Sequence, residues 1–449
     1  MSAVSRALSA VSVLLLALWL SPADFGYWAS AYSAMWVVLS MVNFGEVNAY
    51  LSGHGSDFAT TRRSTFRMNL LLTAIAGAIS GVYLLAGNTD VGVLGLFIAA
   101  SVPLTGDSDL LYAAAVRHKK YRAVLVSQVG SAVVKLGVGV LLAAWTDSAI
   151  AIAIATLVYY AAQEIVLWPV VARAAKRVEP PSKGVITTRQ RFAWAANSYF
   201  MALPVQAALF VAQFLATPYV LGVFYLAFQA TLSVSGVLVP SIARVSLSTF
   251  AASSPLQRVR AARRLTAIFG AALLAIAALA GLVGPFAMRL FGEDWAVALP
   301  VAVILLASLP MRIMGPILDA YQQSDNRWWQ STAFSVADTV LTALAATTAL
   351  MGNVLALASA VSLAKVTLGA VRTYWVFRDQ TPRHWIALVA PVTTGGLCVV
   401  VGVLAGGVLG AALMVASLGI ATAWLAALRG THSADPITPS LSVRAPVVK

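Results

Sequence analysis

Nine charged residues lie inside long apolar stretches of this sequence, where a charge is energetically costly. Three of them are basic, namely Lys135, Arg312 and Lys365, and the six acids are Glu46, Asp107, Asp109, Glu164, Asp319 and Asp338. A charge at the centre of a membrane-spanning helix costs about 2.5–3.5 kcal/mol on insertion scales, so these side chains should pair or face a water-filled cavity. In such a cavity, basic groups can bind an anionic substrate, and acids can take up H⁺ or Na⁺.

The depth of each charge within its stretch separates two expectations. Those near the middle are expected to face a cavity: Lys135, Arg312, Asp338 and Lys365. Those near the ends are expected to pair or to extend to the surface: Glu46, Glu164 and Asp319. Asp107 and Asp109 fall between these cases. Pairing that merely holds helices together, without any ligand, remains open for all nine.

The stretch around Arg312 is the most irregular, because Pro300, Pro310 and Gly315-Pro316 interrupt it. A proline inside a helix removes a backbone hydrogen-bond donor and can kink the helix. Pro103 precedes Asp107 in a comparable way. Broken helices beside charges are tolerated in a membrane where they line protein or water, which favours a binding cavity here. Ordinary proline kinks without a ligand are the alternative.

Motifs for enzymatic chemistry are absent from the sequence. It contains no Gly-x-x-x-x-Gly-Lys-Ser/Thr phosphate loop, no Gly-x-Ser-x-Gly elbow and no zinc-protease helix. The four histidines lie apart in polar stretches, and a single cysteine, Cys398, can form no internal disulfide. We therefore predict no catalytic residue, no metal site and no cofactor.

Composition sets the class of the protein. Hydrophobic residues make up 60% and charged residues 10% of the 449 residues, and the mean hydropathy is +0.84. Soluble domains carry roughly 25% charged residues, and about 20 apolar residues cross a bilayer as a helix. We therefore predict an all-α integral membrane protein with about 14 transmembrane helices, at 7–20, 27–51, 68–85, 91–116, 123–144, 149–171, 192–216, 220–242, 265–290, 297–318, 328–351, 354–377, 385–404 and 408–428.

Basic residues predict the orientation of these helices. The net charge of +14 would suit nucleic acid, but the Lys and Arg residues lie in short loops between apolar stretches, which argues against that partner. Apart from the three buried cations and Arg289, every Lys and Arg falls in alternate loops that would all face one side. Because basic loops stay in the cytoplasm, both termini are predicted to be cytoplasmic. A cleaved signal peptide over the first span would leave the remaining orientation unchanged.

A weak internal repeat predicts two halves. Gly26-Tyr27-Trp28 with Ala31 and Tyr32 matches Gly222-Val223-Phe224 with Ala227 and Phe228, and each set enters a new span from the outer surface. The predicted domains are an N-terminal six-helix lobe (1–172), a cytoplasmic linker (173–191), a C-terminal six-helix lobe (192–378), two additional transmembrane helices (379–429) and a disordered cytoplasmic tail (430–449). Repeated bundles that rock against each other are a common plan of transporters.

These features together resemble a known family. The carriers are Pro22-Ala23-Asp24-Phe25-Gly26-Tyr27, Asn43-Phe44-Gly45, the 222–227 segment, Pro240 before a basic loop, and Phe291-Gly292-Glu293-Asp294-Trp295. Over roughly residues 5–430 the chain resembles the polysaccharide (oligosaccharide) flippases of bacterial envelope biosynthesis. Their superfamily also holds multidrug exporters and lipid II flippases.

The resemblance implies a function in the bacterial cytoplasmic membrane. Members of this family carry a polyprenyl-pyrophosphate-linked glycan from the cytoplasmic to the outer leaflet by alternating access, beside glycosyltransferases and a glycan polymerase. Lys135, Arg312 and Lys365 would then offset the pyrophosphate charge. Glu46, Asp107, Asp109 and Asp338 would pair with these cations or bind a coupling ion.

Two other functions remain open at this point. A Na⁺- or H⁺-coupled exporter of small amphipathic or cationic molecules would depend on Glu46, Asp107 or Asp109 and tolerate loss of the three cations. A membrane scaffold without transport activity would tolerate substitution of all nine charges.

Overall fold

The structure is a computed structural model that describes residues 8, 11–43, 45–51, 57–175, 199, 203–204, 206–251, 253–324, 327–378 and 382–430. These residues form helices joined by short turns, and no strand occurs among them. Eleven helical segments of this part are long and apolar enough to cross a membrane. The prediction of an all-α, multi-spanning membrane protein is confirmed.

The first half of the chain contributes one bundle. Its helices are α2 (Pro22–Ser40), α3 (Glu46–Leu51), α4 (Phe58–Leu85), α5 (Thr89–Arg117), α6 (Tyr121–Thr146) and α7 (Ile150–Ala175). A capping box fixes the start of α2, since Ser21 and Asp24 each bond the other's backbone N–H. Two residues with positive φ, Lys119 and Asp147, form the turns at the two ends of α6.

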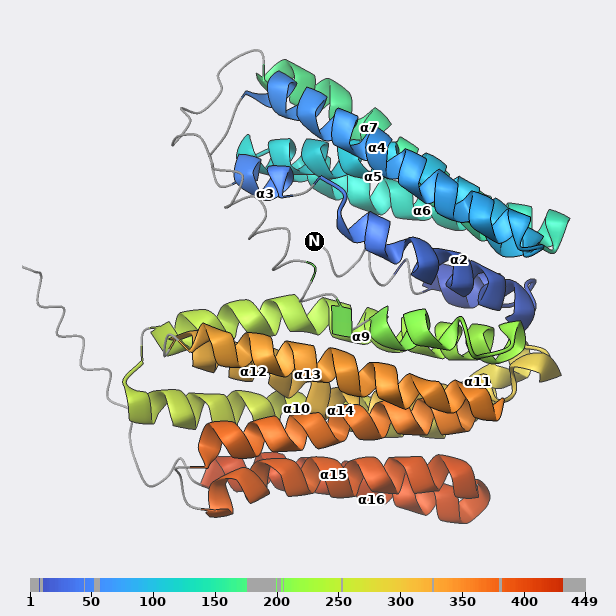
Figure 1. Ribbon diagram of the computed structural model, residues 1–449. Helices are drawn as coiled ribbons and strands as arrows, with labels where there is room; N and C mark the ends of the chain where they lie inside the picture. Colours follow the sequence, from blue (N-terminus) through green and yellow to red (C-terminus); the bar gives the residue numbers. More distant parts are fainter. Residues whose placement is uncertain are drawn as a thin grey trace, which may run out of the picture.

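The second half forms a bundle of similar composition. Its elements are α9 (Pro218–Ala251), α10 (Pro255–Ala287), η1 (Met288–Leu290), η2 (Glu293–Trp295), α11 (Ala298–Ala307), α12 (Leu309–Ser324), α13 (Trp328–Ala346), η3 (Thr347–Met351) and α14 (Val354–Phe377). Two further helices follow, α15 (Pro382–Ala405) and α16 (Gly407–Gly430), and they pack on α10. Figure 1 shows the two bundles, with α15 and α16 on the side of the second bundle far from the first.

The same helix pairs pack in both bundles. In the first, α4 packs on α5, α5 on α7 and α6 on α7; in the second, α10 packs on α12, α12 on α14 and α13 on α14. The sequence repeat matches Gly26 of α2 with Gly222 of α9, and these two helices occupy equivalent places. In the part of the chain that the structure describes, two helical bundles with matching packing are therefore followed by two C-terminal helices.

The apolar core is shared at one end of the molecule and divided at the other. One large cluster joins α2 residues such as Phe25 and Met35 to α9 residues such as Phe224 and Phe228. Towards the opposite end each bundle has its own cluster, around Leu110 in the first and Met314 in the second. Because a shared core resists separation, the halves are joined at the end where α2 and α9 begin.

Two glycines let α2 and α9 approach at that end. A Cβ on Gly26 would lie 1.9 Å from the carbonyl oxygen of Pro218, and one on Gly222 would lie 1.6 Å from that of Pro22. No other residue type fits where two backbones meet so closely. The repeated glycines, found in the sequence as a match between halves, mark the crossing that joins them.

Most predicted spans overlap helices, but several have wrong bounds or are broken. Helix α9 continues to Ala251, beyond the predicted end at 242, and α10 begins at Pro255, before the predicted start at 265. The predicted span 27–51 is broken, because α2 ends at Ser40 and a turn with positive φ at Asn43 and Gly45 precedes α3. The predicted span 68–85 starts too late: α4 begins at Phe58, after Asp57 caps it by accepting a hydrogen bond from the Thr60 N–H. Hydrogen bonding from the Thr60 side chain, with a smaller contribution from its backbone N–H, lowers the pKa of the Asp57 carboxyl.

Some predicted segments lie largely outside the described residues. They are the first part of the seventh span, most of the linker 173–191 and nearly all of the tail 430–449, whereas residues 8 and 11–20 of the first span are described. The domain boundaries drawn through them remain predictions.

Candidate functional site

Two of the three predicted cations meet in the second bundle. Lys365 on α14 is 7% exposed, and its Nζ lies 2.6 Å from Oδ1 of Asp338 on α13. The same ammonium donates to the Pro204 carbonyl at 3.1 Å. Arg312 on α12 interacts electrostatically with both Lys365 and Asp338. Two positive charges here face a single carboxylate.

Arg312 lies at the break that the prolines predict. The predicted span 297–318 divides at Ser308, between α11 and α12. Pro300 and Pro310 fall in the first turns of these helices, where a backbone donor is not needed, and Pro316 lies inside α12. The guanidinium of Arg312 lies 5.8 Å from the ring centroid of Phe228 on α9. Within the described part of the chain, Arg312 forms no salt bridge at contact distance.

An aromatic pocket lies in the first bundle, between α2, α5 and α7. Its volume is 260 Å³, and its lining includes Trp28, Tyr32, Trp36, Thr105 and Tyr160. The three aromatic residues of α2 are spaced four apart and therefore share one face of the helix. Trp28 and Tyr32 stack with centroids 6.0 Å apart. Rings with polar edges in a small pocket are suited to the apolar faces and hydroxyls of a sugar.

The pocket and the cationic group lie on either side of the crossing of α2 and α9. Trp28, which lines the pocket, donates through Nε1 to the Tyr225 hydroxyl at 3.0 Å. Tyr225 is one helical turn from Phe228, the ring that contacts Arg312. A substrate held between the two halves would therefore meet aromatic rings on one side and positive charge on the other.

The third predicted cation lies elsewhere. Lys135 on α6 lies with its Nζ 5.6 Å from the ring centroid of Tyr159 on α7, so the structure does not bring it to Arg312 and Lys365. Asp109 on α5 is exposed and lies near Tyr160 of the pocket. No hydrogen bond or ion pair of Asp109 to another described residue occurs.

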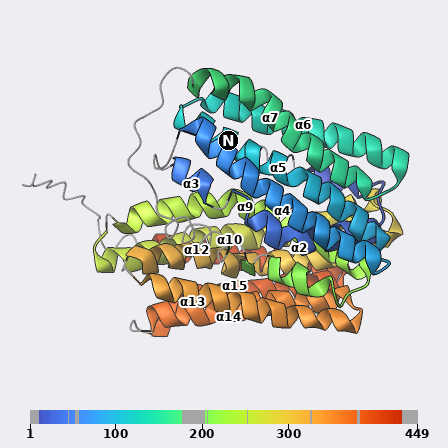
Figure 2. The same cartoon turned by 45° about the horizontal axis from the view of Figure 1, so that its top comes forward.

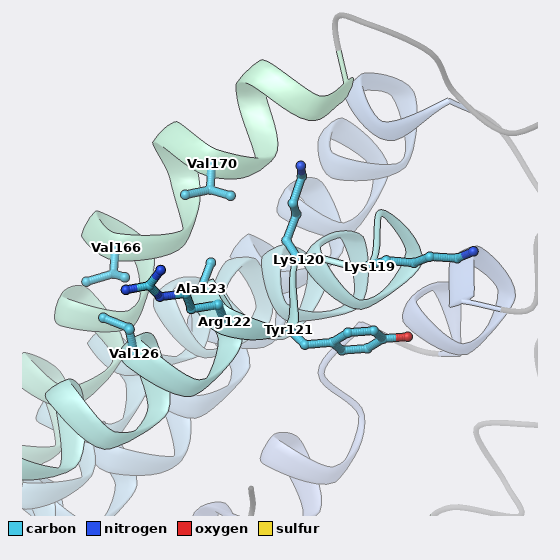
Figure 3. Close-up of a pocket in the computed structure, with 8 residues that line it drawn as sticks. All are labelled: Lys119, Lys120, Tyr121, Arg122, Ala123, Val126, Val166 and Val170. Atoms are coloured by element: carbon cyan, nitrogen blue, oxygen red, sulfur yellow. The ribbon is translucent and has the colours of Figure 1, made fainter.

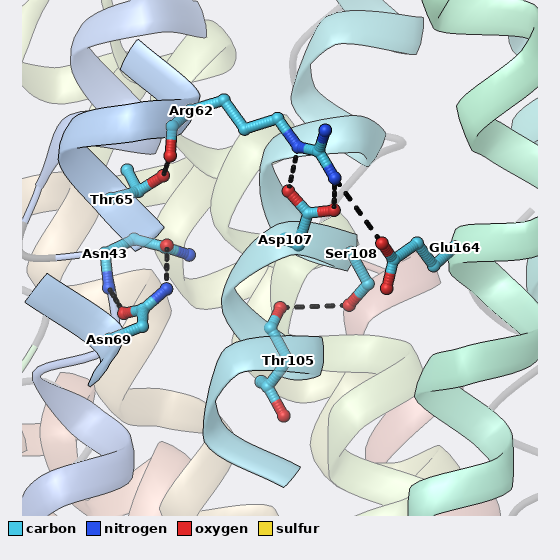
Figure 4. A network of polar contacts seen from close by, with 8 residues as sticks. All are labelled: Asn43, Arg62, Thr65, Asn69, Thr105, Asp107, Ser108 and Glu164. Carbon is cyan, nitrogen blue, oxygen red and sulfur yellow. Dashed lines mark hydrogen bonds and ion pairs between the residues drawn. The ribbon is translucent and has the colours of Figure 1, made fainter. Parts of the chain in front are cut away.

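Asp107 belongs to a different group, at the end of the first bundle where the halves have separate cores. Figure 4 shows its carboxylate held by Arg62 of α4 through two bonds of 2.6 and 2.7 Å. Arg62 also lies 3.5 Å from Glu164 of α7 and stacks on Trp168 at 4.0 Å. This group ties α4, α5 and α7 together, which is the pairing expected for Glu164.

A neutral polar pair, Asn43 and Asn69, lies beside this group in Figure 4. Asn69 accepts from the Asn43 N–H and donates to the Asn43 side chain, both at 3.2 Å. A Cβ on Gly106 would lie 1.8 Å from the Asn69 amide nitrogen, so glycine is required beneath it. The turn after α2 accounts for Asn43 and Gly45 of the Asn43-Phe44-Gly45 segment, since both have positive φ. Phe44 lies outside the described residues.

The predicted acid Glu46 accepts a hydrogen bond from the Ser64 hydroxyl at 3.4 Å.

The second bundle has a comparable ion pair near the same end. Arg372 of α14 binds Asp319 of α12 and donates to Gln322 at 2.7 Å. Ser331 of α13 also donates to Asp319. The helices of this contact, α12, α13 and α14, correspond in their packing to α5, α6 and α7 of the first bundle.

Sequence reasoning missed two residues of these groups. The sequence predicts Arg62 and Arg372 to lie in cytoplasmic loops, which is wrong, because each lies inside a helix and pairs with an acid of a neighbouring helix. For Arg62 the missing signal was the start of α4 at Asp57, which an N-cap search would have found. The aromatic face of α2 was also missed, although its spacing of four residues was visible.

Solved structures of other proteins share this arrangement of helices. Among solved structures, "Lipid II flippase MurJ, inward closed conformation" matches with a TM-score of 0.68 and 12% identity, covering 95% of this chain and 96% of that one. An "inward-facing conformation of a multidrug resistance MATE family transporter of the MOP superfamily" matches with a TM-score of 0.55 and 15% identity, covering 85% and 95%.

The curated proteins contain no significant match. The model of the family described as "Polysaccharide biosynthesis protein" matches residues 15–300, which is more than half of the chain. Family and fold neighbours are transport proteins rather than enzymes, as the sequence predicts. The chain therefore belongs to the polysaccharide biosynthesis protein family and has the fold of these two solved structures, a flippase and a transporter.

Proposed function

We propose that the protein carries a lipid-pyrophosphate-linked oligosaccharide from the cytoplasmic to the outer leaflet of the bacterial cytoplasmic membrane. The observation that supports this most is the excess of positive charge in the second bundle. Arg312 and Lys365 share the single carboxylate of Asp338, beside the crossing of α2 and α9. A half-buried arginine that shares one carboxylate with a lysine lacks compensating negative charge, and a pyrophosphate would supply it.

The aromatic pocket supports the glycan part of the substrate. Trp28, Tyr32 and Trp36 offer ring faces for sugars, while Ser101 and Thr105 offer hydroxyls. The pocket lies across the α2–α9 crossing from the cations, so one molecule can present its sugar to one half and its pyrophosphate to the other. The lipid chain would remain in the bilayer outside both.

Movement of the two bundles relative to each other would carry the substrate across the membrane. They share a core where α2 and α9 begin and have separate cores at the other end, which is the form expected of a substrate path open to one side. With both termini cytoplasmic, the open side faces the cytoplasm, where lipid-linked glycans are assembled. Glycosyltransferases on that face and a glycan polymerase on the outer one are the partners this route implies.

The test is transport by the purified protein in proteoliposomes that contain a lipid-linked oligosaccharide. A glycosidase added outside reports the sugar that has crossed. Arg312→Gln and Lys365→Gln should each slow transport by about 10–100-fold, since a charged hydrogen bond contributes roughly 1.5–3 kcal/mol. Arg63→Gln, which removes an exposed charge on α4, is the matched control and should stay within twofold. Equal rates for all three variants would contradict the proposal.

A specific residue favours the second function, export of small cationic molecules coupled to H⁺ or Na⁺. Asp109 is exposed inside the first bundle, near the pocket residue Tyr160, with no partner among the described residues. An acid of this kind is suited to a cation. If Asp109→Asn abolished transport of a cationic dye while Arg312→Gln and Lys365→Gln did not, this second function would be the correct one.

A further inference from the structure

A second cavity lies at the surface of the first bundle, between the start of α6 and the end of α7. Its volume is 460 Å³, and it is lined by Lys119, Lys120, Tyr121, Arg122, Ala123, Val126, Val166 and Val170. In Figure 2, α6 and α7 lie at the upper edge of the first bundle, and α13 and α14 lie at the lower edge of the second. This cavity, here called the α6–α7 groove, is thus separate from the pocket beside α2.

Positive charge gathers at this groove without a counterion. In Figure 3 the Arg122 side chain runs across it between Val126 and Val166, and Lys120 extends towards the end of α7. Both side chains are exposed. The lining contains no carboxylate, and neither cation forms an ion pair with a described residue. An anion would therefore meet two basic groups that no other described residue uses.

The backbone fixes these cations in place. Lys119 has a φ of 57°, a conformation that costs a non-glycine residue about 1–2 kcal/mol. The turn is closed by bonds from the Lys119 N–H to the Val116 carbonyl at 2.9 Å and from the Lys120 N–H to the Ala115 carbonyl at 2.7 Å. Lys120 then stands at the N-cap of α6 without a side-chain capping bond. The first N–H groups of a helix favour an anion, so backbone and side chains attract the same charge.

The opposite part of the groove is apolar. Val126 is 53% exposed, and Val166 and Val170 of α7 face it from the other side. A soluble anion would gain nothing from this wall, whereas an acyl chain would. Basic pockets between membrane helices on the cytoplasmic side are suited to anionic lipid headgroups.

We propose that the α6–α7 groove binds an anionic phospholipid, with its phosphate between Lys120 and Arg122 and an acyl chain along the three valines. The proposal requires a multi-spanning protein and does not depend on the transported substrate. A lipid bound here would hold the ends of α6 and α7 at the level of the headgroups while the bundles move.

The test uses the full-length protein in detergent and native mass spectrometry, with phosphatidylglycerol, phosphatidylcholine and inorganic phosphate as probes. We expect phosphatidylglycerol to bind at least tenfold more tightly than phosphatidylcholine. The double variant Lys120→Gln/Arg122→Gln should lose that preference. Arg63→Gln/Arg67→Gln removes two exposed charges from the start of α4, and it should keep phosphatidylglycerol affinity within twofold of the original.

A second variant keeps the charges and fills the apolar part. Val166→Trp should weaken phosphatidylglycerol binding at least fivefold, while size-exclusion behaviour and thermal unfolding show that the fold is intact. Equal loss in both double variants would mean a general surface-charge effect and would overturn the proposal. Full displacement of the lipid by millimolar phosphate, or unchanged binding in Lys120→Gln/Arg122→Gln, would overturn it as well.

Discussion

At the scale of residues, the buried charges divide into pairs that hold helices together and groups that leave charge unbalanced. Arg62 with Asp107 and Glu164, and Arg372 with Asp319, lie at the end where the bundles have separate cores. Arg312, Lys365 and Asp338 lie deeper and carry an excess of positive charge. We assign the first kind to stability and the second to the substrate.

The pair of Arg62 and Asp107 predicts an asymmetry between two variants. Arg62→Gln leaves the nearly buried Asp107 carboxylate without its cation, so the free energy of unfolding should fall by about 3 kcal/mol. Asp107→Asn leaves Arg62 with Glu164 and Trp168, and it should cost less, about 1 kcal/mol. Thermal unfolding in detergent measures both. An equal effect of the two substitutions would contradict the network drawn around Arg62.

The sequence could predict these residues only where a charge stands out within an apolar stretch. It found Arg312, Lys365 and Asp338, because nothing else in their stretches is charged at that depth. It placed Lys135 with them, but which face of α6 carries Lys135 depends on helix rotation, which the pattern of apolar residues around it does not fix. It missed Arg62 because an amphipathic first turn of α4 has the composition of a loop.

At the scale of elements, the crossing of α2 and α9 is the main contact between the halves. Gly26 and Gly222 allow the close approach, and Phe25, Tyr225 and Trp295 pack around it. The repeat in the sequence indicated that these segments are equivalent. It gave no indication that they touch, since internal similarity carries no information on distance.

Gly→Ala substitutions should distinguish the effect of close contact at this crossing on stability from the effect of helix propensity. Gly26→Ala and Gly222→Ala place a methyl group against a backbone carbonyl, so each should destabilise the protein by about 1–3 kcal/mol. Gly130→Ala on α6 meets nothing within 4 Å, and it should be neutral or stabilise by up to about 1 kcal/mol. Thermal unfolding of the three variants checks this. Equal stability of all three would show that α2 and α9 do not cross as closely as described.

At the scale of the whole molecule, a shared core at one end and separate cores at the other imply that transport requires the shared end to open. The two solved structures named above are titled as inward conformations. The all-helical, multi-spanning class followed from hydropathy, and the orientation inferred from the basic loops stays a prediction. The division of the core did not, because it depends on which apolar faces meet in space.

A reversible cross-link at the shared end should stop the cycle. Ser33 of α2 donates to Gln213 at 3.0 Å across the two halves. In a Cys398→Ser background, Ser33→Cys with Gln213→Cys joined by a short bifunctional thiol reagent should block transport, and reduction should restore it. Each single cysteine treated with the same reagent serves as the control. Undiminished transport by the cross-linked protein would mean that this end need not open.

The proposed function requires Arg312 and Lys365 for the movement of a lipid-linked glycan across the membrane. The most direct measurement is the amount of lipid-linked oligosaccharide on the cytoplasmic face of cells that lack the protein. We predict that lipid-linked oligosaccharide accumulates in these cells, that wild type clears it, and that Arg312→Ala and Lys365→Ala fail to clear it. The same assay with Lys135→Ala tests whether the third cation is needed. Absence of any accumulated lipid-linked sugar would contradict the claim, as would full clearance by Arg312→Ala and Lys365→Ala.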